Sequence, residues 1–225
     1  MSKIIPCICI PSSGQVKAKF AVSLASMMCR IGAARLKEGI EEQRVNVYLL
    51  EGSNIAENRM KLVKRAMDAG GTHVVFIDDD MSFPNDMLQR LLAHNLPIVA
   101  CNYPRRRPHK GFVAGKLDGT MMLTTATSTG LEEALWTGFG FAVIEIEVFK
   151  RLSLPWFVNA WVAEAQGFTT EDIPFCAKVR EAGYRILIDH DASKQVQHCG
   201  TYEYAWDDSL TEFRSGDEVD DVAVD

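Results

Sequence analysis

The feature that most constrains the fold of this chain is an apolar run, 73–77, followed at once by three aspartates at 78–80. A run of β-branched and aromatic residues of this length predicts a buried strand. Ligands of open α/β sheets bind just beyond the carboxyl ends of the strands. Carboxylates gathered at such a position repel one another and lose solvation, so their ionised forms need a compensating cation nearby.

Two interpretations of the aspartates are open from these residues alone. A divalent metal ion that carries a phosphate ligand would supply the cation, because carboxylate oxygens are the ligands that Mg²⁺ and Mn²⁺ prefer. Alternatively, Phe83 and Pro84 mark the start of a following helix, and the aspartates stabilise the N-terminus of that helix through its dipole.

Strand and helix patterns alternate along the chain. Strands are expected at 3–10, 45–50, 73–77, 97–101, 185–188 and 195–198, and helices at 15–38, from Asn54 to Gly70, after Pro84 and at 171–182. Residues 111–146 are rich in glycine, threonine and alternating apolar residues, which predicts shorter, partly antiparallel strands. Repeated βα units imply a parallel sheet between two helical layers. The expected fold class is therefore α/β, with a three-layer Rossmann-like sheet that is mostly parallel and has a smaller antiparallel part in the second half.

We expect a single domain at 1–206, in which 1–101 form a nucleotide-binding half and 102–206 an acceptor half. The remainder, 207–225, holds eight acidic residues and one basic residue and is expected to be a disordered tail. The net charge of −6 therefore arises in the tail, and the domain is nearly neutral. No apolar run approaches the roughly 20 residues of a membrane span, and six cysteines without a CxxC pair indicate free thiols. These features favour a cytoplasmic location, in the host cytoplasm if the chain is viral.

Six short motifs occur in a set order and together span most of residues 1–200. They are Asn58-Arg59, the strand with its aspartates at 71–81, Tyr103-Pro104-Arg105 after the strand at 97–101, Gly138-Phe139-Gly140, Thr170-Glu171-Asp172 and His198-Cys199-Gly200. In this order they resemble the GT-A fold glycosyltransferases, particularly the compact family-2-like enzymes of phages and viruses. The resemblance implies a metal-dependent enzyme that moves a sugar from a nucleoside-diphosphate sugar, expected to be a UDP-sugar, to a hydroxyl acceptor.

The resemblance assigns a metal ion, Mn²⁺ or Mg²⁺, to the aspartates and to a late histidine. Asp80 reaches the ion, and Asp78 lies near the ribose and a metal-bound water. His198 completes the metal shell, because imidazole is a suitable ligand of Mn²⁺. The nearby His190 is typical of a turn and ranks below it. Whether Asp78 or Asp79 contacts the sugar nucleotide stays open.

Asp172 follows Thr170 at the start of a predicted helix, where the ionised form of a carboxylate is favoured. Such a carboxylate suits a general base that accepts a proton from the acceptor hydroxyl. The resemblance assigns this role to Asp172 if the enzyme inverts the configuration of the sugar, with Glu171 as a supporting or acceptor-binding carboxylate. In a retaining enzyme Asp172 would instead bind the acceptor or the sugar. Helix capping is the structural alternative for both residues.

Residues from several segments are expected to bind the donor: Pro11, Ser12, Arg59, Asp78, Asp79, Arg105, Gly138 and Gly140. The turn that begins at Pro11 would face the base and the ribose, and the resemblance directs Arg59 into the nucleotide cleft. The two glycines lack side chains where the backbone passes close to the donor sugar. Tight strand packing is the alternative explanation for these glycines, and a surface position is the alternative for Arg59.

The basic cluster 105–110 has three open interpretations: a solvated loop, a lid that neutralises the diphosphate, and a surface for a polyanionic acceptor such as DNA. The resemblance favours the lid. Trp161 and Glu164 are the expected acceptor contacts, and the acceptor is a glycan or a hydroxylated base in phage DNA. One basic hexapeptide on a nearly neutral domain gives DNA little electrostatic support.

Two other functions stay open from the sequence. The first is a nucleotidyltransferase-like enzyme, which normally carries a glycine-rich loop after its first strand; this chain has a single glycine there, Gly14. The second is a non-catalytic domain that only binds a sugar nucleotide or nucleic acid.

Overall fold

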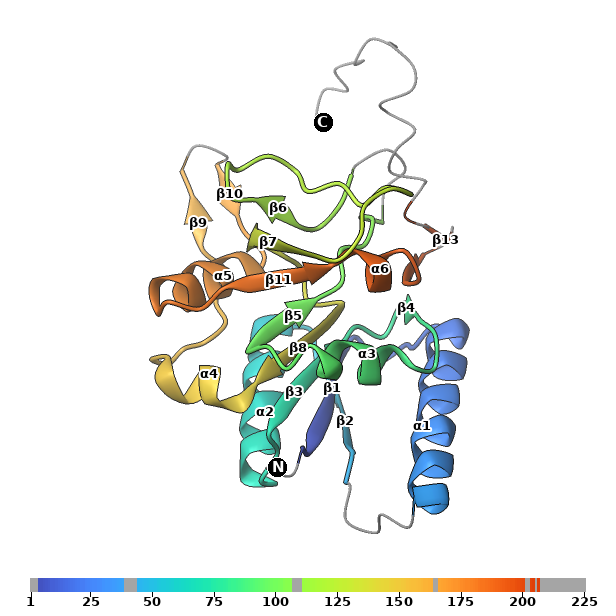
Figure 1. Cartoon of the computed structure of the whole chain (residues 1–225). Helices are drawn as coiled ribbons and strands as arrows, with labels where there is room; N and C mark the ends of the chain where they lie inside the picture. The colour runs from blue at the N-terminus through green and yellow to red at the C-terminus, as the bar shows by residue number, and fades with distance from the viewer. Residues whose placement is uncertain are drawn as a thin grey trace.

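An eight-stranded sheet forms the centre of the structure (Figure 1). The computed structural model describes residues 4–38, 44–106, 111–163, 166–200, 203–204 and 206. The strand order in the sheet is β2-β1-β3-β8-β5-β11-β7-β6. In that order the strands are Asn46–Glu51, Pro6–Ser12, His73–Ile77, Phe141–Glu145, Ile98–Ala100, Ile186–Asp189, Leu131–Trp136 and Gly115–Lys116.

Six of these eight strands run in one direction. β1 is parallel to both β2 and β3, and β5 is parallel to β11. β8 lies antiparallel between β3 and β5, and β7 lies antiparallel between β11 and β6. The predicted fold class, α/β with a mostly parallel sheet and a smaller antiparallel part from the second half, is confirmed. The arrangement is a Rossmann-like sheet.

Helices cover both faces of the sheet (Figure 1). They are α1 (Ala18–Glu38), α2 (Ile55–Asp68), α3 (Met87–Ala93), α4 (Ile146–Arg151), α5 (Asp172–Glu181) and α6 (His190–Ser193). Residues of α2, α4 and α5 share one hydrophobic core with Cys7 and Cys9 of β1. Residues of α1, α3 and α6 share the second core with Ile8 and Ile10. The alternation along β1 is the two-residue period of a strand that is buried on both faces.

Two smaller sheets lie beside the main one. The first contains β4 (Met81–Ser82), β12 (Gln197–Cys199) and β13 (Glu203–Tyr204), and the second is the hairpin of β9 (Trp161–Val162) and β10 (Gly167–Phe168). β4 follows the aspartates directly and pairs with β12, and α3 begins only at Met87. The interpretation of residues 78–80 as a helix start is therefore wrong, because a strand separates them from the helix.

Local signals set some of the element ends and miss others. The side chain of Asn54 accepts a hydrogen bond from the backbone N–H of Glu57 at 3.2 Å, as the predicted cap of α2 requires. Gly70, with φ of +70°, ends that helix. β1 continues past its predicted end at residue 10, because Pro11 and Ser12 still pair with β2.

In the described part of the chain, no helix combines the length and the apolar character that crossing a membrane requires. The six cysteines are free, and five of them are buried. The predicted acidic tail at 207–225, the predicted acceptor residue Glu164 and residues 107–110 of the basic cluster lie outside the described residues.

Candidate active site

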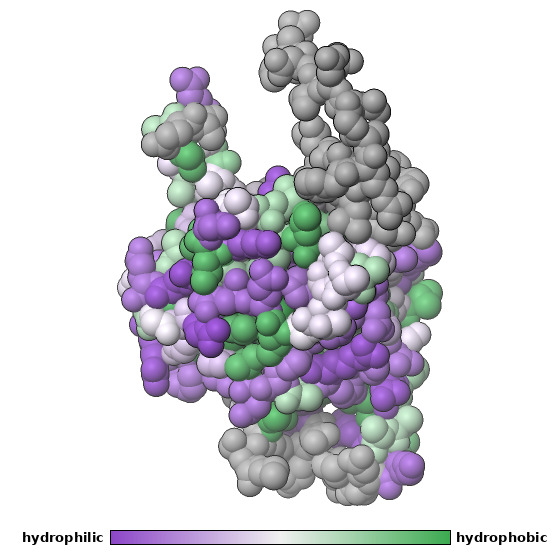
Figure 2. All heavy atoms as spheres, turned by 45° about the horizontal axis from the view of Figure 1, so that its top comes forward, coloured by the Kyte–Doolittle hydropathy of each residue, from purple (hydrophilic) through white to green (hydrophobic). Residues whose placement is uncertain are grey.

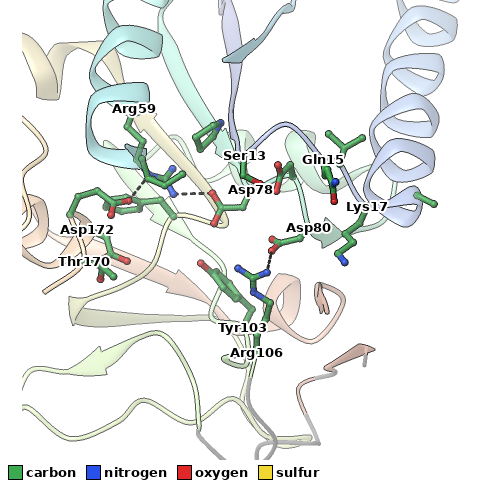
Figure 3. A pocket seen from close by; sticks show the side chains of 17 residues that line it. Ser13, Gln15, Lys17, Arg59, Asp78, Asp80, Tyr103, Arg106, Thr170 and Asp172 are labelled. Atoms are coloured by element: carbon green, nitrogen blue, oxygen red, sulfur yellow. Dashed lines mark hydrogen bonds and ion pairs between the residues drawn. The ribbon is translucent and has the colours of Figure 1, made fainter. Parts of the chain in front are cut away.

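A cavity of about 640 Å³ lies at the carboxyl ends of β1 and β3 (Figure 3). Its walls come from the segment after β1, from α2, from the aspartates after β3, from the loop after β5, and from the segments before β8 and α5. The lining residues are Pro11, Ser13, Gln15, Val16, Lys17, Ala18, Ile55, Arg59, Asp78, Asp79, Asp80, Tyr103, Arg106, Phe139, Thr170, Glu171 and Asp172. This edge of the sheet is where open α/β folds bind their ligands.

Arg59 joins two acidic segments that are far apart in the sequence. Its Nη2 lies 2.9 Å from Asp78 Oδ1, and its Nε donates to Glu171 Oε1 at 2.8 Å. The guanidinium stands over the ring of Phe76 at 4.7 Å, and the arginine is buried. Burial acts to lower the pKa of Arg59, but the negative charges of Asp78 and Glu171 act more strongly to raise it. The pKa is therefore above its ordinary value, and the guanidinium stays charged. The alternative of a surface position for Arg59 is therefore wrong, and the arginine holds both carboxylates in place.

Asp79 secures the segment between β1 and α1. Ser12 Oγ donates to Asp79 Oδ2 at 2.6 Å, and the backbone N–H of Lys17 donates to the Asp79 carbonyl at 2.9 Å. Ser12 Oγ also accepts a hydrogen bond from the N–H of Gly14 at 3.0 Å. These bonds give the middle aspartate of the triplet a structural role: it fixes one wall of the cavity.

Asp80 lies between a histidine and an arginine. Arg106 Nη1 is 3.0 Å from Asp80 Oδ2, and His198 Nε2 is 3.4 Å from Oδ1. The pairing of β12 with β4 brings His198 opposite Met81, so the small sheet creates this contact. Burial acts to raise the pKa of Asp80, but His198 and Arg106 lower it below its ordinary value. Asp80 is therefore an ionised carboxylate.

The surroundings of Asp80 fit a cation. Asp80 Oδ1 is buried and has no hydrogen-bond partner among the described residues. His198 Nδ1 lies 3.0 Å from the carbonyl of Pro104. Since a carbonyl only accepts, Nδ1 carries a proton, so a ring that gives up its Nε2 proton when a cation binds would present the lone pair of Nε2 on the side of Asp80. A carboxylate oxygen facing an imidazole lone pair is a donor set that a Mn²⁺ ion can join.

The predicted three-residue metal set is only partly assembled. Asp80 and His198 face each other, but Asp78 Oδ1 is engaged by Arg59. Within the described ranges, no three or more histidine, cysteine or acidic side chains are arranged to hold a metal ion. The described residues thus offer two ligands, and a metal here would need the rest of its shell from elsewhere, such as a substrate and water.

Asp172 begins α5 and is held on one side only. Its Oδ1 accepts hydrogen bonds from Thr170 Oγ1 and from the N–H of Ile173, the latter at 3.0 Å. Burial raises the pKa of Asp172, as does Glu171, against the lowering effects of Thr170 and Arg59. The sequence predicted that the helix start would favour the ionised form. The structure corrects this, because burial outweighs the stabilising contacts.

The glycines of the Gly138-Phe139-Gly140 motif make room for an aromatic ring. The hydroxyl oxygen of Tyr103 accepts a hydrogen bond from the N–H of Gly140 at 2.7 Å. A Cβ on Gly140 would lie 2.6 Å from Tyr103 Cζ, and one on Gly138 would lie 2.6 Å from the Tyr103 hydroxyl. This packing corrects the expectation that the two glycines leave space for a donor sugar; Phe139 and Tyr103 are the residues that line the cavity.

Within the basic cluster, the structure separates two neighbouring arginines. Arg105, the predicted donor-site residue, donates from Nε to the carbonyl of Phe112 at 3.0 Å and holds its own loop. Arg106 instead lines the cavity and reaches Asp80 (Figure 3). The basic cluster was the sequence signal for a cation in the cavity. Three successive arginines do not indicate which one of them lines the cavity.

The other predicted site residues take varied positions. Pro11 lines the cavity, whereas Ser12 and His198 contact aspartates that line it. Trp161 is exposed on the β9–β10 hairpin, where its ring packs edge-to-face with Phe168 at 5.2 Å. His190 is buried between Thr124 and Glu132.

The face of the molecule in Figure 2 is mostly hydrophilic, with small separate hydrophobic areas between the polar residues. Sequence analysis did not assign the lining residues Gln15 and Lys17, which carry no motif beyond their place after the first strand.

The fold and the site together define an α/β protein with an acidic, arginine-bearing cavity at the carboxyl edge of its sheet. No protein-family model matches the chain, and no curated protein matches it in sequence. Among solved structures, A197 from STIV is similar, with 14% identity, a TM-score of 0.57 and coverage of 87% of this chain and 85% of that one. At this identity the similarity shows a shared fold.

A second similar structure is that of S. aureus TarS 1–349 in complex with UDP-GlcNAc. It has 15% identity and a TM-score of 0.47, and the match covers 84% of this chain and 56% of that one. The chain therefore spans just over half of that fragment.

Proposed function

We propose that the protein is a glycosyltransferase that moves a sugar from a nucleoside-diphosphate sugar, expected to be a UDP-sugar, to a hydroxyl group. The observation that carries this proposal is the meeting of two acidic segments, Asp78–Asp80 and Glu171–Asp172, in one cavity. The first segment suits the diphosphate end of a donor, and the second suits the acceptor end, where a proton has to leave. The proposed acceptor is a glycan or a hydroxylated base in DNA.

Asp80 and His198 are the residues that would hold a Mn²⁺ or Mg²⁺ ion, on the strength of the unpartnered oxygen of Asp80. Such an ion, when bound, stabilises the negative charge that develops on the leaving nucleoside diphosphate. Arg59 keeps Asp78 beside this position and neutralises part of the acidic wall. The negative charge of the wall that a diphosphate would meet is therefore partly neutralised by side chains that are already in place.

Asp172 is the proposed general base of an inverting reaction. Glu171 is ion-paired with the buried Arg59, whereas the contacts of Asp172 are hydrogen bonds from Thr170 and Ile173 to Oδ1, so Asp172 is the carboxylate that we assign as the base. With Oδ1 held by Thr170 and Ile173, Oδ2 takes the proton of the acceptor hydroxyl as the new glycosidic bond forms and the bond to the diphosphate breaks. The raised pKa of Asp172 makes its carboxylate a stronger base.

The test of the donor site is calorimetric titration with UDP, GDP and CDP, each with and without Mn²⁺. One diphosphate is expected to bind tightly with the ion and to lose its affinity without it. Asp80→Ala should weaken the binding at least about tenfold, because a ligand of the ion is lost. Asp68→Ala removes a carboxylate whose partner is Lys64 on the surface of α2, and it serves as the matched control.

Three results would contradict the proposal in different ways. Binding of no diphosphate under any condition would leave a GT-A-like domain without a donor. Unchanged affinity in Asp80→Ala would remove the metal assignment alone. Preference for a nucleoside triphosphate with release of pyrophosphate would instead indicate a nucleotidyltransferase.

A further inference from the structure

The contact between Arg106 and Asp80 joins a buried side chain to an exposed one. The side chain of Asp80 is 8% exposed, whereas that of Arg106 is 56% exposed. A half-exposed guanidinium loses little hydration in either position, so it can leave the carboxylate at small cost when another cation takes its place. The other arginine of the cavity, Arg59, lacks this freedom because its side chain is 4% exposed and bonded to two carboxylates.

The charges around Asp80 indicate why the contact exists. Arg59 compensates Asp78 and Glu171, and Ser12 satisfies Asp79. Without Arg106, Oδ1 of Asp80 would still have no hydrogen-bond partner, and Oδ2 would have only water from the cavity in place of a cation. Arg106 therefore supplies the positive charge that Asp80 needs when no other cation is present.

A donor and its metal ion would change this balance in two opposite ways. The ion supplies Asp80 with positive charge, which makes Arg106 redundant there. The diphosphate brings negative charge into the cavity that Arg106 lines, and a guanidinium pairs well with phosphate oxygens. Both changes favour movement of Arg106 from the carboxylate to the diphosphate.

We propose that Arg106 is an exchangeable counterion: it occupies Asp80 when the cavity holds no donor, and it pairs with the donor diphosphate when the metal ion takes Asp80. The diphosphate half of this statement rests on the function proposed above, and the Asp80 half does not. A single side chain then opposes metal binding in the empty protein and supports donor binding in the loaded one. Its removal should have effects of opposite sign on the two affinities.

The test uses the full chain with Arg106→Gln. Binding of Mn²⁺ without nucleotide is followed by the loss of the free-ion signal in electron paramagnetic resonance, and UDP, GDP and CDP are then titrated calorimetrically at saturating Mn²⁺. We expect Mn²⁺ affinity to rise roughly threefold to tenfold and the affinity for the binding diphosphate to fall by a similar factor. Arg106→Lys keeps the charge and should lie between the wild type and Arg106→Gln in both measurements.

Arg185→Gln is the matched control. Arg185 is an exposed arginine whose Nε lies 2.6 Å from Glu133 Oε2, and neither residue lines the cavity. This substitution removes the same charge and should leave both affinities unchanged. Equal effects of the two substitutions would reduce the role of Arg106 to long-range charge and overturn the proposal. So would an unchanged or weaker Mn²⁺ affinity in Arg106→Gln, or an unchanged diphosphate affinity.

The two proposals fail separately. If the wild type binds Mn²⁺ but none of the three diphosphates, the proposed function fails and the diphosphate half falls with it. The rise in Mn²⁺ affinity then still decides the Asp80 half. If the wild type binds no Mn²⁺ without nucleotide, the Asp80 half is overturned.

Discussion

The two arginines of the cavity show how differently one residue type is used within a few ångström of the same acidic cluster. Arg59 is enclosed: it bonds to Asp78 and Glu171 and stands over the ring of Phe76. Arg106 is open: it has one carboxylate partner, and more than half of its side chain is exposed. The first arginine connects elements of the fold, and the second is attached to a loop.

The difference follows from solvation. A buried ion pair cannot be broken without leaving an uncompensated charge in a low-dielectric interior, so Arg59 behaves as a fixed part of the structure. Water can replace an exposed guanidinium, so Arg106 can be exchanged for another cation. The comparison indicates that the contacts of Arg59 are fixed parts of the cavity. The contact of Arg106 is the one that we propose to change when ligands bind.

The largest expected effect concerns Asp172, the neighbour of the carboxylate Glu171 that Arg59 holds. Asp172→Asn keeps the size of the side chain but removes the proton acceptor, so sugar transfer should fall about 10²-fold to 10⁴-fold. Nucleotide affinity should stay within about twofold, since Asp172 acts on the acceptor. Transfer assays and calorimetry on the same preparation measure both quantities. Retained transfer would show that the reaction needs no base at this position.

Arg59→Met tests whether the enclosed arginine is a fixed structural part. It leaves Asp78 and Glu171 without their counterion and should lower the free energy of unfolding by about 3–5 kcal/mol. Chemical denaturation gives this value. Arg65→Met, at an exposed position of the same helix, should cost under about 1 kcal/mol. Equal losses in the two variants would show that Arg59 is no more structural than an exposed arginine, and the contrast with Arg106 would fail.

Arg106→Met applies the same change to the open arginine. Because water can solvate the vacated side of Asp80, the free energy of unfolding should change by about 1 kcal/mol or less. Denaturation curves measured beside those of Arg59→Met provide the direct contrast. A loss as large as that of Arg59→Met would mean that Arg106 is as structural as Arg59.

The smallest expected effect is a shift in the pH profile. Asp172 works as a base only when ionised, so transfer should decline as the pH falls through its raised pKa. The hydrogen bond from Thr170 lowers that pKa, so Thr170→Val should raise it and move the acid limb to higher pH, by less than about one pH unit. Rates measured between pH 4 and pH 8 would show the shift. Movement towards lower pH would exclude Asp172 as the group responsible.

Local patterns in the sequence carried much of the fold. The apolar run at 73–77 became a buried central strand, and Asn54 caps its helix as predicted. The helix α3 begins at Met87, later than the predicted start at Pro84, and the sequence did not predict the strand β4. A two-residue strand has no periodicity to detect, and it forms here only because β12 pairs with it.

The sequence predicted several residues of the candidate site but not the contacts between them. Asp78, Asp80 and Asp172 line one cavity, as expected, but their partners were not foreseen. The bond between Arg59 and Glu171 spans 112 positions, and the choice of Arg106 over Arg105 depends on how one loop folds back on Phe112. Side-chain contacts of this kind leave no local signal.

The sequence by itself determined the longer strands and helices and showed that a row of aspartates ends one of these strands. These properties depend on neighbouring residues, through backbone preferences and the two periods of burial. Only the tertiary structure decided which charges meet. The strand order places β8 between β3 and β5, and the pairing of β12 with β4 brings His198 to Asp80. These strand pairings form because they allow both faces of the whole sheet to be buried in the two hydrophobic cores. No single segment of the sequence contains that information.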